Sequence, residues 1–481
     1  MTDRDVAGGA RPSTSGDDAP GVDEPTVTDR DGPAGGKPTS TLPERDRPGL
    51  FEAYGVEIEY MIVDRETLDV LPVCDRLIEA VTGAPDSEVE RGAIAWSNEL
   101  TLHVLELKTN GPADRLTGLA GAFHESVADA DRHLEGLGAR LMPGGMHPWM
   151  DPASETRLWP HEYTEVYRTF DRIFGCSGHG WANLQSTHLN LPFRDDEEFG
   201  RLHAAIRLVL PLIPAIAASS PFVEGRHRPE LDARLAMYRG NARRVPSVAG
   251  HVVPEAAFTR SQYEREVLGR IYDDLAELDP QGVLRHEWVN ARGAIARFDR
   301  GAVEIRLIDT QECPTADLAV VAAVSEVVRA LTTGPLAERD VAEDPGHERL
   351  AAVLDRTIVA ADAAPIEDEG YLRAIGLTPP SSIGPRGGSR RAPFAGDVWR
   401  RLVDRHPPAD LGVGEARALE TQLRHGPLAR RMLRAVGRGG DAGAEKGGER
   451  GGADSGVPRS ELRALYQDLC GCLALNEPFS S

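Results

Sequence analysis

Lysine is almost absent from this chain of 481 residues, because only three of its 54 basic residues are lysine: Lys37, Lys108 and Lys446. Neither of the glycine-rich phosphate motifs, GxGxxG or GxxxxGK(S/T), occurs in the sequence. Because Lys108 is the only lysine of the predicted core, nucleotide binding through a P-loop lysine is excluded. Any positive side chain that binds an anionic ligand in the core is therefore expected to be arginine, which can bind phosphate or carboxylate through two hydrogen bonds.

The chain also lacks a long apolar run and a cysteine framework. The longest apolar run, Val209–Ala218, contains two prolines and is too short for a membrane span. The polar residues Asp3–Asp5, with no apolar segment behind them, are not typical of a signal peptide. The five cysteines are an odd number without a CxxC spacing, which predicts reduced thiols. We therefore expect a cytoplasmic protein with no membrane partner.

Charge and composition narrow the class of protein further. The chain carries 76 acidic against 54 basic residues, a net charge of −22, which repels nucleic acid, so we expect no nucleic-acid partner. Apolar residues make up 41% of the chain and charged residues 27%, which is typical of a globular protein. The arginine bias fits either GC-rich coding or adaptation to salt, and the sequence leaves both open.

Composition divides the chain into five segments. Residues 1–48 contain many Asp, Gly, Pro, Thr and Ser and few large apolar side chains, which is typical of a disordered tail. Residues 437–458 are dominated by glycine and predict a flexible linker. A Gly/Pro/Ser/Arg stretch at 379–393 predicts an exposed loop. The remaining predicted segments are a main domain at 49–335, a helical region of the same unit at 336–436, and a terminal helix within 459–481.

Alternation of apolar and polar residues predicts four half-buried strands with their charges on one face. Helical periodicity predicts four longer helices. Uneven alternation of strands and helices indicates an α+β fold with a mostly antiparallel sheet, one polar face and helices on the other face. The predicted strands are Val56–Tyr60, Thr101–Leu107, Ser186–Leu191 and Ala302–Leu307, and the predicted helices are Leu116–Leu137, Arg201–Ala217, Ser261–Leu278 and Ala316–Leu331.

The polar face of the first strand carries two acids. Glu57 and Glu59 are two residues apart, so both side chains point to one side, with backbones about 7 Å apart. A strand with its polar face in water would explain such a pair. Here, however, the run is otherwise apolar, and the nearest basic residue along the chain is Arg65. Two carboxylates so placed repel one another unless a cation lies between them.

The other strands add acids, a histidine and an arginine. Glu99 and Glu106 are seven residues apart, and this odd spacing predicts that one of them lies before the strand or across a bulge. His188 lies on the third strand, and Glu304 and Arg306 on the fourth. Each feature alone also fits a surface, a buried core histidine or a salt bridge. Together they predict a site for a hard cation such as Mg²⁺, with Arg306 available to a phosphoryl group.

Five segments in order resemble the glutamate–cysteine ligase family of carboxylate-amine ligases, which have a glutamine-synthetase-like catalytic fold. The resemblance covers residues 50 to 335. The segments are GVEIEYMIV, NELTLHVLELKT, GGMHPW, QSTHLNLPF and EWVNARGAIARFDRGAVEIRLIDTQECP.

The resemblance implies ATP-dependent amide formation, in which a substrate carboxylate attacks the γ-phosphate of ATP and an amine captures the acyl phosphate. Two or three Mg²⁺ ions and the cosubstrate ATP are implied. Arg306 and Glu304 match the family's catalytic positions, and Arg239, Arg292 and Arg297 are weaker candidates for binding ATP or the amino acid. The implied metal ligands are Glu57, Glu59, Glu99, Glu106, His188 and Glu304.

Three functions remain open at this point. The first is joining glutamate to cysteine, which would give γ-glutamylcysteine, ADP and phosphate. The second is a ligase of the same kind with a different amine or acid, and the third is a non-catalytic nucleotide or amino-acid binding protein of the same fold. The expected partners are small molecules, namely ATP, glutamate and an amine such as cysteine. The sequence leaves open whether the chain forms a homo-oligomer.

Overall fold

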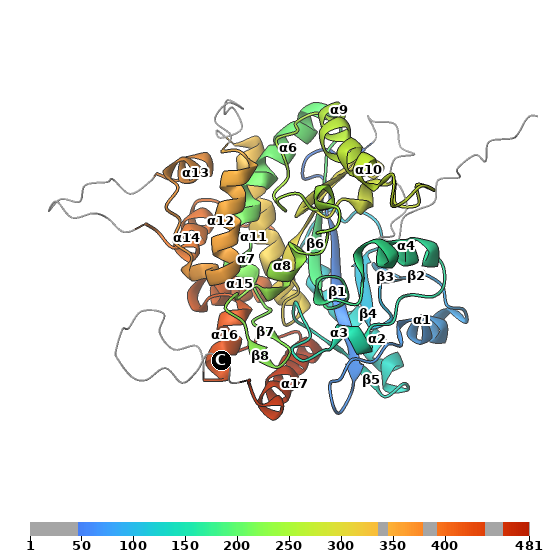
Figure 1. Ribbon diagram of the computed structural model, residues 1–481. Helices are drawn as coiled ribbons and strands as arrows, with labels where there is room; N and C mark the ends of the chain where they lie inside the picture. The colour runs from blue at the N-terminus through green and yellow to red at the C-terminus, as the bar shows by residue number, and fades with distance from the viewer. Residues whose placement is uncertain (1–46, 335–344, 379–391, 438–455, 481) are drawn as a thin grey trace, which may run out of the picture.

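A computed structural model describes residues 47–334, 345–378, 392–437 and 456–480. The predicted tail at 1–48, loop at 379–393 and linker at 437–458 lie almost entirely outside these residues. The main sheet has eight antiparallel strands in the order β2-β3-β4-β1-β6-β10-β9, with β5 also paired to β1 (Figure 1). Its strands are β1 (Gly55–Asp64), β2 (Glu88–Arg91), β3 (Ile94–Asn98), β4 (Val104–Thr109), β5 (Ala139–Met142), β6 (Ser186–Pro192), β9 (Ala294–Arg297) and β10 (Ala302–Asp309).

Helices pack against this sheet. A separate small hairpin is formed by β7 (Phe222–Val223) and β8 (Arg226–His227). The helices are α1 (Cys74–Thr82), α2 (Leu119–Glu135), α3 (Pro152–Glu155), α4 (Thr164–Phe174), α5 (His179–Ala182), α6 (Asp196–Val209), α7 (Pro214–Ala217), α8 (Ala233–Tyr238), α9 (Arg260–Tyr263), α10 (Gly269–Leu275), α11 (Pro314–Thr333), α12 (His347–Ala360), α13 (Glu369–Ala374), α14 (Ala395–Arg405), α15 (Val413–His425), α16 (Leu428–Ala435) and α17 (Arg459–Leu475).

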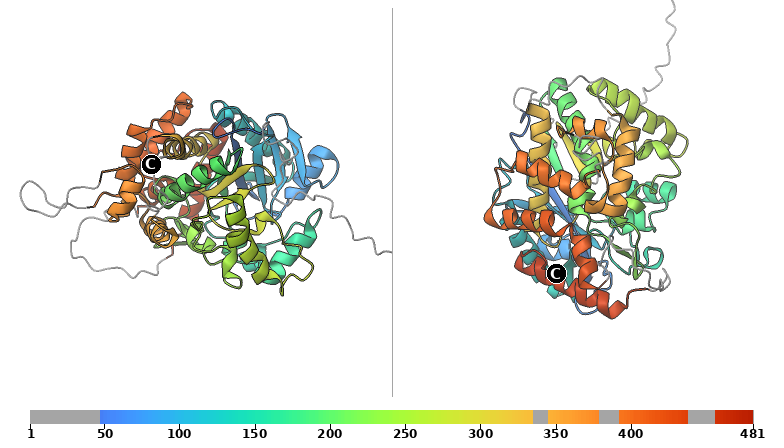
Figure 2. Two further views of the ribbon diagram at one scale, coloured as in Figure 1. Left: turned by 90° about the horizontal axis from the view of Figure 1, so that it is seen from above. Right: turned by 90° about the vertical axis from the view of Figure 1, so that its left-hand side faces the viewer.

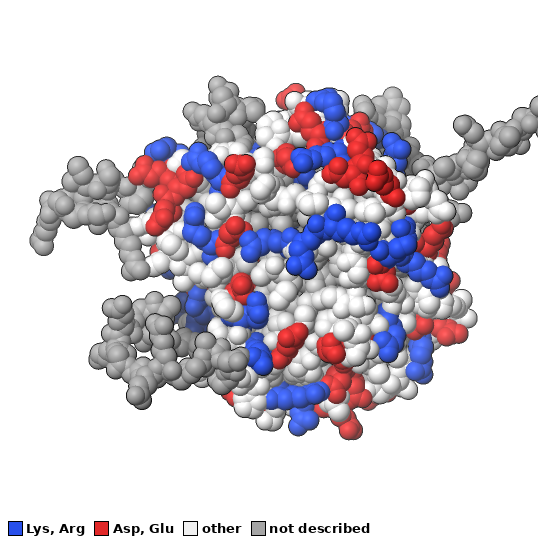
Figure 3. Space-filling view, viewed as in Figure 1, with Lys and Arg blue, Asp and Glu red and all other residues white. Residues whose placement is uncertain are grey.

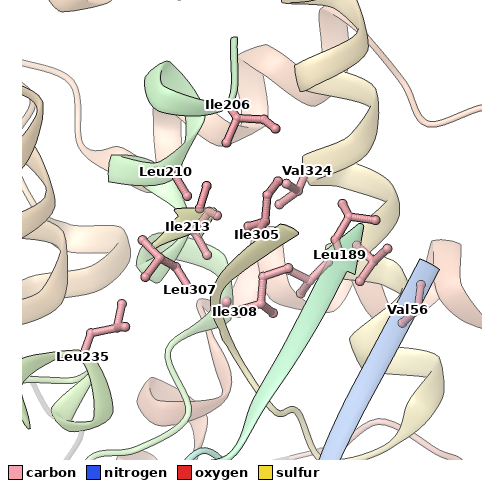
Figure 4. Close-up of a cluster of buried hydrophobic side chains, with 14 of the residues drawn as sticks. Val56, Leu189, Ile206, Leu210, Ile213, Leu235, Ile305, Leu307, Ile308 and Val324 are labelled. Atoms are coloured by element: carbon pink, nitrogen blue, oxygen red, sulfur yellow. The ribbon is translucent and has the colours of Figure 1, made fainter. Parts of the chain in front are cut away.

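The main core lies between one face of the sheet and a layer of helices. Val56, Leu189 and Ile305 come from the three neighbouring strands β1, β6 and β10 and are fully buried. They pack in one cluster with Ile206 of α6 and Val324 of α11 (Figure 4). Because side chains alternate along a strand, this burial turns the intervening residues of the same strands to the opposite face. The predicted α+β class with a mostly antiparallel sheet is confirmed.

The C-terminal helices form a second layer beside the core. Helices α12 to α16 lie together on the side of α7 and α11, where Figure 2 shows them from above and from the side. Helix α17 packs against α2 and β5, and its range, Arg459–Leu475, lies within the segment 459–481 for which the sequence predicts a terminal helix. Within the described residues, the cysteines are all free, and no helix has both the length and the apolar character that crossing a membrane requires.

Several predicted elements differ in detail from the structure. The predicted helix Arg201–Ala217 is interrupted after Val209 by the 3-10 turn Leu210–Leu212, because proline cannot donate the helical hydrogen bond. The predicted helix Ser261–Leu278 contains a π-helical turn at Glu264–Leu268. The predicted strand Thr101–Leu107 begins only at Val104.

Candidate active site

Four neighbouring strands, β4, β1, β6 and β10, turn polar side chains to the face of the sheet opposite the core. Residues directly opposed on antiparallel strands have Cβ atoms about 4.5–5.5 Å apart. Sheet pairing therefore gathers residues that are far apart in the sequence. The opposed pairs are Glu59 with Glu106, Glu57 with His188, and Glu304 with Asn190.

His188 lies among three of the predicted acids. Its Nδ1 atom is 3.0 Å from Glu57 Oε2 and 3.9 Å from Glu304 Oε1, and its Nε2 atom is 3.8 Å from Glu59 Oε1. Burial lowers the pKa of His188, but the hydrogen bond to Glu57 and the three negative charges outweigh it and raise the pKa to about 9. His188 can therefore carry a positive charge among these acids, and it would have to lose that proton in order to bind a metal ion.

A second group of acids lies beside the first. Oxygen atoms of Glu59, Glu99 and Glu106 are within 4.8 Å of one another, and so are ligand atoms of Glu57, Glu106 and His188. Burial and the neighbouring acids raise the pKa of Glu99 well above its usual range and that of Glu106 to about 7. Glu106 Oε2 is buried and has no hydrogen-bond partner among the described residues. Glu99 directly follows β3 and lies before β4 begins, which confirms the prediction drawn from its odd spacing.

The donor set of this cluster fits Mg²⁺. Carboxylate oxygens are the ligands that Mg²⁺ prefers, and a cation between the two groups would relieve their mutual repulsion. Glu106 Oε2 is the orphaned buried atom that such an ion would satisfy. Glu57 and Glu59 are 7% and 8% exposed, Glu106 is 1% exposed and Glu304 is fully buried, so water alone compensates little of their charge.

Two arginines contact Glu304, but they differ in access to a ligand. Arg306 Nε donates to Glu304 Oε1, and the Arg306 side chain keeps 18% of its surface exposed and lines a cavity. Arg297 donates from Nη1 to Glu304 Oε2 at 3.4 Å and from Nη2 to Asp299 at 3.1 Å, and it is buried. Arg306 can therefore contact an anion bound in the cavity, whereas Arg297 is buried and forms hydrogen bonds with Glu304 and Asp299.

A cavity of about 180 Å³ opens above the acids. Its lining combines charged and polar side chains with aromatic ones, so the cavity can hold charged groups beside an apolar part of a ligand. The polar residues include Glu59, Glu99, Glu106, His188 and Arg306, and the aromatic ones are Tyr167, Phe170, Trp181, Tyr238 and Trp288.

Sequence reasoning missed the contribution of α8. Arg234 lines the cavity, donates from Nη2 to the Arg306 carbonyl oxygen at 3.3 Å, and pairs through Nε with Asp309. Tyr238, one helical turn later, lines the cavity too. The only signal in the sequence was the spacing of four between Arg234 and Tyr238, which puts both on one side of a helix.

The three arginines predicted to bind a cofactor do not line the cavity. Arg292 donates to both carboxylate oxygens of Glu255, at 2.6 and 2.7 Å. Arg239 pairs with Asp355 at the surface, and Arg297 is engaged by Glu304 and Asp299 as described. Each guanidinium is held by a nearby carboxylate, so these predictions gain no support from the packing. Predicted metal ligands and Arg306, in contrast, lie together in one site.

Comparison with known proteins gives a family match and several relatives. The sequence model of glutamate-cysteine ligase family 2 (GCS2) matches residues 53–361. An uncharacterized protein of Archaeoglobus fulgidus is 33% identical over 329 residues, which cover 67% of this chain and 88% of that protein. A protein of a Nocardioides species with the name "Putative glutamate--cysteine ligase 2-1" is 27% identical over 384 residues, covering 78% of this chain and 88% of that protein.

A solved structure shares the fold. The crystal structure of glutamate–cysteine ligase from Francisella tularensis in complex with AMP superposes with a TM-score of 0.53 at 12% identity, covering 87% of this chain and 89% of that one. At this identity the likeness concerns the arrangement of the chain in space.

Proposed function

The chain belongs to glutamate-cysteine ligase family 2, and from this premise we propose that it is an ATP- and Mg²⁺-dependent carboxylate-amine ligase. Its first proposed reaction joins the γ-carboxylate of glutamate to the amino group of cysteine. The observation that carries the proposal is the buried acid cluster, in which Glu59 and Glu99 lie close to Glu106 and no described residue donates a hydrogen bond to Glu106 Oε2. Such a cluster fits a cation that holds phosphate groups.

The proposed cation site uses the six predicted ligands. Bound Mg²⁺ would supply positive charge to the phosphate oxygens of ATP and to the attacking carboxylate. Ser186 fixes one ligand, because its main-chain N–H donates to Glu59 Oε2 at 2.6 Å. Asn190 Nδ2 fixes another, Glu57, by donating to Oε1 at 3.1 Å. The ligands are Glu57, Glu59, Glu99, Glu106, His188 and Glu304.

Two arginines supply the positive side-chain charge that this proposal requires. Arg306 is aimed by Glu304 and lines the cavity, where it can neutralise charge on the phosphoryl group during transfer. Arg234 is held by Asp309 and lines the same cavity, where it can bind a substrate carboxylate. No lysine is needed for either step.

The aromatic side chains that line the cavity would protect the acyl phosphate from water. An acyl phosphate is lost to hydrolysis if water reaches it, and an apolar wall limits that access. Phe170, Trp181 and Trp288 pack against one another, with ring centroids 5.5 Å apart for Phe170–Trp181 and 5.9 Å for Phe170–Trp288. The amine then attacks the acyl carbon, and phosphate leaves, without a covalent bond to the protein. The thiols fit this scheme, since Cys74, Cys176, Cys313 and Cys470 are buried.

ADP release tests the proposal. The purified full chain is incubated with Mg²⁺, ATP and glutamate, and single amines are added in turn. Release that depends on cysteine supports the first reaction, and release with another amine supports a ligase of different specificity. Release that fails with all amines, although ATP binds, contradicts a ligase and favours a binding protein of the same fold.

A further inference from the structure

A band of arginines crosses the face of the molecule that carries α8 and α4 (Figure 3). Arg168 and Arg172 lie one turn apart on α4, and Arg239, Arg243 and Arg244 follow directly after α8. All five side chains are exposed. We call these five residues the arginine rim.

Most of the rim's charge is not neutralised by acids. Arg239 pairs with Asp355, but no described acid forms an ion pair with Arg168, Arg172, Arg243 or Arg244. Some exposed arginines elsewhere in the described chain are paired, as Arg349 is with Asp368 at 2.6 Å, and others, such as Arg417 and Arg424 on α15, have no ion pair with a described acid. The rim differs because five exposed arginines lie on two segments that frame one cavity. The rim is therefore locally positive in a chain whose net charge is −22.

Main-chain contacts hold two rim residues in place without cancelling their charge. Arg172 Nη1 donates to the Leu278 carbonyl oxygen at 2.7 Å. Arg244 Nη1 donates to the Ile173 carbonyl oxygen at 3.0 Å, which ties the segment after α8 to the end of α4. A carbonyl oxygen carries only a partial charge, so both guanidinium groups keep their field.

The rim borders the cavity that lies above the acid cluster. Helix α4 contributes Tyr167 and Phe170 to the cavity wall, and α8 contributes Tyr238, the residue before Arg239. The two segments that bear the rim are thus the same segments that frame the aromatic side of the cavity. A positive zone at the mouth of a low-dielectric cleft raises the local concentration of anions and the rate at which they enter.

We propose that the arginine rim attracts anionic substrate to the cavity, above all the nucleoside triphosphate. It does so over long range, although the net negative charge of the chain repels anions elsewhere on the surface. This inference rests on the proposed function for the identity of the anion. The acid cluster itself repels a free triphosphate, and the rim offsets that repulsion at the entrance. The contribution is to the association rate, because exposed charges act before contact and are screened by salt.

The test uses Arg168→Gln with Arg243→Gln in the full chain. Neither side chain has a hydrogen bond or ion pair with a described residue, so the double variant removes two charges without breaking a polar interaction of the described chain. The matched control is Arg417→Gln with Arg424→Gln on α15, which removes the same charge from exposed arginines that do not line the cavity. The probe is a fluorescent ATP analogue with Mg²⁺, mixed with protein in a stopped-flow instrument over a range of NaCl concentrations.

At low salt we expect the rim variant to associate about 3- to 10-fold more slowly than wild type, with a flatter dependence on salt and a dissociation rate close to wild type. The control should match wild type. Equal association rates and equal salt dependence in the rim variant and the control would overturn the inference, and so would a change confined to the dissociation rate. Failure of the proposed function is distinguished by the ADP assay, because nucleotide binding is measured here without turnover.

Discussion

At the scale of single residues, Glu57 and Glu304 test the proposed cation site. We expect Glu57→Gln and Glu304→Gln each to lower the rate of ADP release by more than about 100-fold, because each removes a charged ligand. Each should also weaken Mg²⁺ binding, which raises the Mg²⁺ concentration that gives half of the maximal rate. Steady-state rates over a Mg²⁺ titration measure both effects. Glu420→Gln, at an exposed position on α15, is the matched control. Variants with rates and Mg²⁺ dependence like the control would show that the metal assignment is wrong.

Asp317 predicts a pH dependence of stability that does not involve the cation site. Burial raises the pKa of this carboxyl from 3.8 to about 8, although Thr187 Oγ1 donates to it at 2.6 Å. Because the folded state holds a proton that the unfolded state has lost, stability due to Asp317 falls as pH rises from about 4 to about 8. Asp317→Asn removes this loss.

The free energy of unfolding, measured in urea at pH 5, 6, 7 and 8, checks this expectation. The stability of Asp317→Asn relative to wild type should improve with pH, by up to about 1.4 kcal/mol per pH unit. Asp404→Asn, at an exposed position of α14, should track wild type throughout. A difference between Asp317→Asn and wild type that stays constant with pH would contradict the account.

The acids could be predicted from the sequence, but the arginine of α8 could not. Glu57 and Glu59 stand out because they interrupt an apolar run at a spacing of two, and strand geometry then fixes their common face. Arg234 has no such local signal. It reaches the cavity because it pairs with Asp309, 75 residues further along the chain, and that contact depends on how α8 packs beside β10. The spacing of four between Arg234 and Tyr238 indicates a common helix face, but nothing in the residues around Arg234 indicates that this face meets Asp309.

At the scale of elements, α17 is predicted to be a stabilising part of the folded unit although it lies beyond the matched family region. Leu469 of α17 is fully buried in a cluster with Val63 and Met142 of the sheet. Leu469→Ala should therefore cost about 2–5 kcal/mol of unfolding free energy, since it leaves a cavity. Leu475→Ala, 69% exposed near the end of the same helix, should cost little. Urea unfolding that gives equal values for the two variants would contradict the packing of α17.

Elements with a clear period were predicted well. Strands β1, β6 and β10 follow from alternation, and α11 follows from a long helical pattern. The order in which the strands pair could not be predicted, because β1 and β6 are neighbours in the sheet although more than a hundred residues separate them in the chain. The interruption near Pro211 does not follow from the period of the pattern, because the apolar residues continue on both sides of the proline.

At the scale of the whole molecule, acidic and basic residues are concentrated in two different places. Part of the acidic excess is buried on the polar face of the sheet, where Glu57, Glu59 and Glu106 are at most 8% exposed. The arginine rim belongs to the band of basic side chains on the outer surface (Figure 3), on the two segments that also supply Tyr167, Phe170 and Tyr238 to the cavity. The molecule thus concentrates negative charge at the floor of the proposed site and positive charge at its mouth.

The central claim is that a substrate carboxylate is activated as an acyl phosphate, and one isotope measurement tests it most directly. Glutamate labelled with ¹⁸O in its γ-carboxylate is incubated with the full chain, Mg²⁺, ATP and the amine that supports ADP release. Attack of the carboxylate oxygen on the γ-phosphorus, followed by displacement by the amine, leaves that oxygen on the released phosphate. The account predicts one ¹⁸O atom in each phosphate by mass spectrometry, and phosphate free of ¹⁸O would contradict it.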